Sequence, residues 1–109
     1  MRAMEIYRNG TLAGILTEEN RRHFVFRYDD IYFNDVTKPA ISLTLPKTQK
    51  QYSSDFFFPF FSNMIAEGEN KKLQSRLLKI DENDQFGLLM STATADTIGN
   101  ITVRKIDSK

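Results

Sequence analysis

Apolar and polar residues alternate along the first third of the chain, which is the pattern of strands that bury one face. The alternation runs over residues 4–8, stops at Asn9-Gly10 and resumes over residues 11–17. Asn-Gly suits a two-residue type I′ hairpin because both of its residues need positive φ. A third run, residues 23–28, places aromatic side chains on one face: Phe24, Phe26 and Tyr28. These runs predict an antiparallel three-stranded meander.

Two prolines frame one more short extended run. Residues 41–45 alternate between Pro39 and Pro46, and proline is tolerated at the edge of a sheet but not in its middle. We therefore expect residues 41–45 to form an edge strand. Residues 47–52, by contrast, are polar and show no period.

An apolar block in the middle of the chain predicts the first helix. Ser53-Ser54-Asp55 offers capping oxygens before the block, residues 56–65. Pro59 lacks the amide proton that an interior helical position would use, so the regular helix should begin near Phe58 or at Pro59 itself. Gly68 is expected to end it.

Periodicity and capping predict two further helices. From Asn70 onward, apolar residues recur at spacings of four and three, namely Leu73, Leu77 and Ile80. This spacing is typical of a surface helix with one buried stripe. Asn83 or Asp84 can cap a third helix that carries residues 86–90.

A last alternating run, residues 101–106, follows Gly99 and predicts a final strand. Strands, then helices, then one strand indicate an α+β fold, in which a small antiparallel sheet (the N-terminal meander plus the C-terminal strand) packs with about three helices. The chain has 109 residues, of which 40% are apolar, so we expect residues 1–109 to form a single domain.

Charge and composition exclude several classes of function. Fifteen basic residues against fourteen acidic ones give a net charge of +1, which provides no global attraction for nucleic acid or anionic lipid. Without cysteine there is no disulfide, thiolate metal site or cysteine nucleophile, and one histidine makes no cluster. No stretch resembles a signal peptide or approaches the roughly 18 apolar residues of a membrane span. We expect a cytoplasmic protein that binds neither membrane nor nucleic acid directly.

No residue pattern indicates catalysis. His23 stands beside Arg22 with no nearby carboxylate in sequence, so a structural or solvent-facing role is favoured. The glycines are too scattered to cradle phosphates, and helix capping explains Asp81, Glu82 and Asp84 more simply than metal binding does. We therefore expect no catalytic residues, no cofactor and no metal.

Five phenylalanines lie close together, at positions 56, 57, 58, 60 and 61, and they would point in nearly every direction from one helix. The simpler interpretation puts Phe57, Phe60, Phe61 and Met64 in the core and the others over loops. The alternative is that Phe56 and Phe58 face a partner.

Three segments, in this order, resemble the N-terminal subdomain of the HipA family of toxin kinases. Residues 42–46 read Ser-Leu-Thr-Leu-Pro, and residues 60–68 read Phe-Phe-Ser-Asn-Met-Ile-Ala-Glu-Gly. Residues 84–89 read Asp-Gln-Phe-Gly-Leu-Leu and are followed by Asp-Thr-Ile-Gly-Asn-Ile at residues 96–101. With the opening Asn-Gly hairpin, the resemblance covers almost the whole chain.

The resemblance implies a function through binding. Full-length members continue into a kinase core with ATP-binding and catalytic residues, whereas this chain is similar to HipS, the short component of three-part HipBST toxin-antitoxin systems. It would then be a non-catalytic antitoxin or regulatory subunit that binds and neutralises a separate HipA/HipT-like serine/threonine kinase. A HipB-like DNA-binding protein could join the same complex. The main alternative is a structural subunit that completes a split kinase and is required for its activity. Direct operator binding ranks last, because no helix-turn-helix pattern is present.

The same resemblance suggests where the kinase would bind. Candidate contacts surround the turn of the second segment: Glu67, Gly68, Glu69, Asn70, Lys71 and Lys72, with Phe56 and Phe58 as apolar contacts. Ala66 replaces the family's proline and the chain has no tryptophan, so a bulky inhibitory wedge is not carried over. Charge and hydrogen bonds would act instead. An ordinary turn between helices, with a solvated basic face after it, is the competing interpretation.

Overall fold

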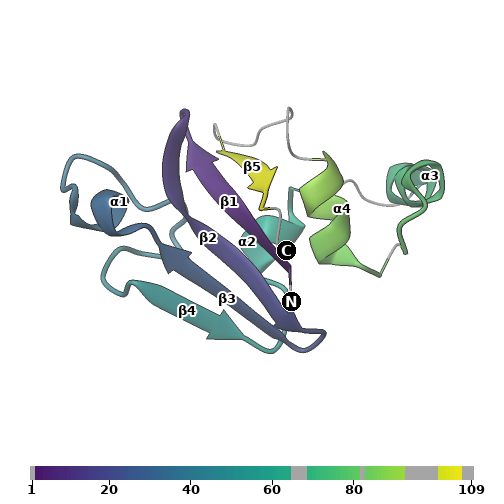
Figure 1. Ribbon diagram of the computed structural model, residues 1–109, viewed down its shortest axis with the longest axis horizontal. Coiled ribbons are helices and arrows are strands. Elements are labelled where there is room, and N and C mark those ends of the chain that lie inside the picture. The colour runs from purple at the N-terminus through teal and green to yellow at the C-terminus, as the bar shows by residue number, and fades with distance from the viewer. Residues whose placement is uncertain (1, 65–68, 82, 93–100, 107–109) are drawn as a thin grey trace.

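Five strands form one antiparallel sheet in the order β4-β3-β2-β1-β5, shown in Figure 1. This computed structural model describes residues 2–64, 69–81, 83–92 and 101–106. The strands are β1 (Arg2–Arg8), β2 (Thr11–Asn20), β3 (His23–Tyr28), β4 (Gln51–Ser54) and β5 (Ile101–Lys105). The helices are α1 (Asp30–Asn34), α2 (Pro59–Ser62), α3 (Glu69–Leu78) and α4 (Gln85–Thr92). The predicted α+β class is confirmed.

The N-terminal meander has the predicted turn. Asn9 and Gly10 both have positive φ, at 51° and 80°, so the hairpin between β1 and β2 closes as the dipeptide indicated. The third predicted strand is confirmed as β3, and the last one as β5, which pairs with β1. The chain therefore returns at its end to the strand with which it began.

One face of the sheet is buried under short helices. Its core residues come from alternate positions of the strands: Met4, Ile6, Leu16, Phe24, Phe26, Tyr28, Ile101 and Val103. Phe61 of α2 packs on Phe26 of β3, with ring centroids 5.7 Å apart. Phe86 of α4 meets Phe57, just before α2, at 6.3 Å. Aromatic contacts thus fix both helices to the sheet.

The predicted edge strand at residues 41–45 is wrong. This segment lies in a loop whose carbonyls are held by side chains: the Tyr28 hydroxyl donates to Leu45 O, and Lys47 Nζ donates to Lys38 O at 2.8 Å. The edge position belongs to β4, which pairs with β3 although its residues showed no apolar period. The loop follows α1, a helix that was not predicted and is capped by Asp29.

The helical predictions are correct at two boundaries and wrong at others. The first helix begins at Pro59 as expected, but it ends already at Ser62, and its expected end at Gly68 lies outside the described residues. Ser53 and Ser54 belong to β4 instead of capping this helix. Asp84 caps α4 as predicted, since its carboxylate accepts from the Gly87 amide at 3.0 Å.

The predicted buried stripe on α3 is wrong in its main point. The periodicity did locate a helix, Glu69–Leu78, yet Leu73 and Leu77 are exposed. Only Ile80, beyond the helix, packs against the core. An amphipathic pattern shows which face is apolar, but not whether the same chain covers it.

Two glycines of the meander provide a test of its geometry. At Gly10 an added Cβ would meet nothing, so Gly10→Ala should cost only backbone strain, about 1 kcal/mol of unfolding free energy. At Gly14 a Cβ would lie 2.8 Å from the Phe26 ring and would also collide with the Arg27 carbonyl. Gly14→Ala should therefore cost about 2–3 kcal/mol. Urea unfolding of both variants checks this order, and equal losses would contradict it.

Candidate functional site

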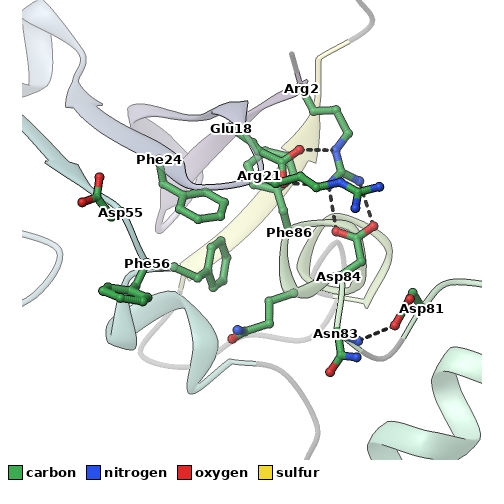
Figure 2. A pocket seen from close by; sticks show the side chains of 12 residues that line it. Arg2, Glu18, Arg21, Phe24, Asp55, Phe56, Asp81, Asn83, Asp84 and Phe86 are labelled. Carbon is green, nitrogen blue, oxygen red and sulfur yellow. Dashed lines mark hydrogen bonds and ion pairs between the residues drawn. The ribbon is translucent and has the colours of Figure 1, made fainter.

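A groove of about 650 Å³ lies between the end of the sheet and the start of α4. One wall consists of Phe24 in β3 with Asp55 and Phe56 after β4, and the opposite wall is the turn that contains Asp81 and Asn83. Figure 2 shows these side chains around the opening. The groove therefore joins two segments that are separated in the sequence.

Arg2 connects the sheet to the first turn of α4 beside the groove. Its Nε donates to Glu18 Oε1 at 2.8 Å, and its Nη2 donates to Asp84 Oδ1 at 2.7 Å (Figure 2). The guanidinium also lies 5.0 Å from the centroid of the Phe86 ring. A planar group with five donors can serve two carboxylates at once, which an ammonium could not do with the same geometry. We call Arg2, Glu18 and Asp84 the Arg2 clamp.

The electrostatics of the Arg2 clamp stabilise its charged form. The hydrogen bond from Arg2 lowers the pKa of Asp84 from its ordinary value of 3.8, partial burial opposes the shift, and the Gly87 amide adds to it. Hydrogen bonds to Asp84 and Glu18 raise the pKa of Arg2 in turn. Glycine at position 87 is required here, because a Cβ would meet the Asp84 carboxylate and come within 3.1 Å of Arg2 Nη1.

Aromatic rings form the floor of the groove, and one ring stands outside it. Phe24 and Phe57 meet edge to face at 5.4 Å, and both are buried. Phe56 is 80% exposed at the mouth, as expected for a residue that faces outward. The same expectation for Phe58 is wrong: it is 7% exposed, because it precedes Pro59 and packs edge to face on Phe61.

His23 has two acidic neighbours that its local sequence did not indicate. Its Nε2 lies 3.4 Å from Glu19 Oε1, across the turn between β2 and β3, and its Nδ1 lies 3.8 Å from Asp55 Oδ1. No carboxylate was noted near His23 in the sequence, yet the folded chain brings two to its ring. Glu19 stands four residues before His23 and could have been found from the hairpin, whereas Asp55 follows β4, the edge strand that pairs with β3.

The remaining candidate contacts fall at the start of α3. Glu69, Asn70, Lys71 and Lys72 belong to this helix and not to a turn before it, and Lys72 is exposed. Glu67 and Gly68 lie outside the described residues. Sequence reasoning did not single out the Arg2 clamp or Arg21, which also lines the groove.

The groove combines apolar and charged side chains. It presents aromatic surface, carboxylates and a guanidinium without a paired nucleophile and base. Across residues 2–64, 69–81, 83–92 and 101–106, no three acidic or histidine side chains gather in a way that could hold a metal ion. Among the described helices, none is long and apolar enough to cross a membrane.

The fold defines the class first: a small α+β domain with one antiparallel sheet that is covered on a single face. Within that class, the chain belongs to the family described as the HipA N-terminal domain, whose model matches residues 4–104. The resemblance found in the sequence is confirmed. A solved structure described as the N-terminal domain of HipA toxin agrees, with a TM-score of 0.73 and 25% identity over 100% of this chain and 96% of that one.

Two relatives differ in how much of them the domain occupies. An uncharacterized protein of Haemophilus influenzae is 31% identical over 91 residues, which cover 84% of this chain and 81% of that protein. A Sinorhizobium fredii protein named "Putative kinase Y4mE" is 22% identical over 89 residues, which cover 82% of this chain. The match spans only 21% of the Sinorhizobium protein.

The Arg2 clamp predicts a loss of stability in acid. Because the pKa of Asp84 is depressed in the folded state, the clamp stabilises the fold fully above pH 3.8 and less as the pH falls through the lowered value. Asp84→Asn keeps a capping oxygen but removes the charge, so its deficit against the wild type should shrink below pH 3.8.

Asp84→Ala should cost more, about 1–2 kcal/mol near neutral pH, since it also removes the cap. Denaturant unfolding between pH 2 and 7 measures both variants. A deficit of Asp84→Asn that does not change with pH would contradict the assignment.

Proposed function

We propose that this chain is a non-catalytic regulatory subunit that binds a separately encoded HipA-type kinase and restrains it, as an antitoxin does. The observation that carries the proposal is Phe56, whose ring is 80% exposed at the mouth of the groove. Large aromatic side chains at a polar groove are typical of protein interfaces, where they become anchors on binding. Docking on a kinase would bury this ring.

The relatives support a binding role for a domain of this kind. The domain makes up most of the Haemophilus protein, and in the Sinorhizobium protein it is a small part of a much longer chain. A domain that packs against a kinase within one chain has a matching surface on that kinase. A separate copy can bind the same surface and shift the kinase toward an inactive state.

The charges at the groove would orient such a complex. Asp55 is largely exposed at one wall and Asp81 is exposed at the other, so basic residues of the kinase could pair with both. Rim charges of this kind contribute more to the association rate and orientation than to affinity. The buried Phe24 and Phe57 give the floor its rigidity.

Completion of a split kinase is the second candidate, and the Sinorhizobium match favours it, because there the domain and the remainder share one polypeptide. The two functions make opposite predictions for the same kinase. If the chain restrains the kinase, its removal raises phosphorylation. If it completes the kinase, its removal abolishes phosphorylation.

Co-expression with a HipA-type kinase from the same genome distinguishes the two. We expect the chain to co-purify with the kinase, to restore growth and to lower autophosphorylation. Co-purification with higher autophosphorylation would support completion instead. If tagged chain and kinase do not co-purify at all, both candidates are wrong.

Substitution of Phe56 tests the anchor. Phe56→Ser should weaken kinase binding roughly tenfold or more, because a central aromatic contact is lost, while the melting temperature stays within a few degrees. Ile31→Ser is the matched control, since Ile31 is 81% exposed and lies on α1 at the other end of the sheet. Calorimetric titration of the two variants gives the comparison, and equal affinities would exclude Phe56 as an anchor.

A further inference from the structure

Helix α3 stands apart from the rest of the domain. Figure 1 shows it beyond α4, away from the sheet. Its apolar residues are turned to solvent: Leu73 is 51% exposed, Leu77 71% and Leu78 43%. We call Leu73, Leu77 and Leu78 the leucine face. Beyond the helix, Ile80 packs against the core and attaches this end of α3 to the domain.

The energetics of a short helix make this exposure informative. A helix of ten residues is marginal in water by itself, since isolated helices need roughly 12–15 residues even with favourable sequences. Helices in proteins gain most of their stability by covering an apolar face. In α3 that contribution is missing within the described chain, because the leucine face is uncovered. A partner that covers the face would supply it.

The charges beside the leucine face indicate what kind of partner fits. Arg76 lies in the last turn of α3, and Lys79 follows the helix; both are exposed. Lys79 has a φ of 57°, in the left-handed region where it ends the helix and turns the chain toward Ile80. Residues 69–79 contain four basic side chains and one acidic one. The apolar face therefore lies in a basic surrounding.

We propose that the leucine face of α3 docks on an acidic amphipathic segment of the partner kinase, one that presents aliphatic side chains flanked by Asp or Glu. The identity of the partner rests on the proposed function; the chemistry of the segment rests on α3. Aliphatic side chains of the segment would cover Leu73 and Leu77, and its carboxylates would pair with Arg76 and Lys79.

Other occupants fit this surface less well. A second copy of the chain would bring two basic faces together, and like charges at an interface are costly. Nucleic acid would pair with the basic side chains but leave the three leucines uncovered. An anionic lipid surface would bind the charges, yet amphipathic helices that lie on membranes usually add aromatic residues to their apolar face, and α3 has none.

Paired substitutions test the leucine face. Leu73→Gln with Leu77→Gln keeps good helix formers while it removes the apolar contact. We expect the kinase affinity of this double variant to fall at least tenfold, with an unchanged melting temperature. Leu43→Gln is the control, because Leu43 is 98% exposed and lies in the loop between α1 and β4, away from α3. Calorimetric titration measures affinity, and hydrogen exchange of the wild-type complex should show new protection in α3.

Charge reversal tests the chemistry of the partner. Arg76→Glu should slow association with the kinase and reduce the dependence of the rate on salt. If wild-type chain and kinase bind but the leucine variants and Arg76→Glu bind equally well, this inference fails and the proposed function stands. If the wild type does not bind the kinase, the proposed function fails first.

The competing occupants have their own readouts. Light scattering would reveal a wild-type dimer that the double variant loses, and this result would overturn the inference in favour of a second copy. Co-sedimentation with phosphatidylglycerol vesicles that depends on Leu77 would overturn it in favour of a membrane surface. We expect a monomer that does not sediment with these vesicles.

Discussion

The sheet has only one buried face, and most of the domain follows from the need to cover it. Alternate side chains of four strands form an apolar layer, and the short helices α2 and α4 cover it with both aromatic and aliphatic residues. The aromatic side chains contribute a large share of this coverage, since each buries about 150–250 Å². Phe57, Phe61 and Phe86 hold the helices at the distances that the ring contacts set. The groove depends on this layer, because Phe24, Phe57 and Phe86 line it.

The Arg2 clamp then fixes what the aromatic layer leaves free. Ring contacts tolerate changes in the relative orientation of two elements, whereas a guanidinium shared by two carboxylates fixes the orientation of the elements that carry them. Glu18 belongs to the sheet and Asp84 to the first turn of α4, so the clamp aligns α4 with β2. Arg2, Glu18 and Asp84 all line the groove, so a change in this alignment would alter its opening.

Local patterns in the sequence predicted the elements that are stabilised locally. The Asn9-Gly10 hairpin, β3, the start of α2 at Pro59 and the Asp84 cap all depend on a few neighbouring residues. The predictions that failed concern elements that depend on residues distant in the sequence. Strand β4 is recognisable only because it pairs with β3, since three of its four residues are polar and both of its faces are at least partly exposed.

The candidate site also combines features that depend on neighbouring residues with features that depend on distant ones. The surplus of adjacent phenylalanines left open whether Phe56 and Phe58 face outward, and no local rule separated the exposed Phe56 from the buried Phe58. Arg2 and Asp84 are 82 residues apart, so their contact exists only in the folded chain. Leu73 and Leu77 were expected to lie on a buried stripe, and only the structure shows that both are exposed.

The pairing of β5 with β1 has a consequence for the order of events during synthesis. Met4 is the partner of Lys105, so one side of β1 stays an open edge until almost the entire chain has left the ribosome. Such an edge can pair with other chains, and contacts that span so much sequence form slowly. The chain is therefore most prone to edge-to-edge association before β5 pairs with β1.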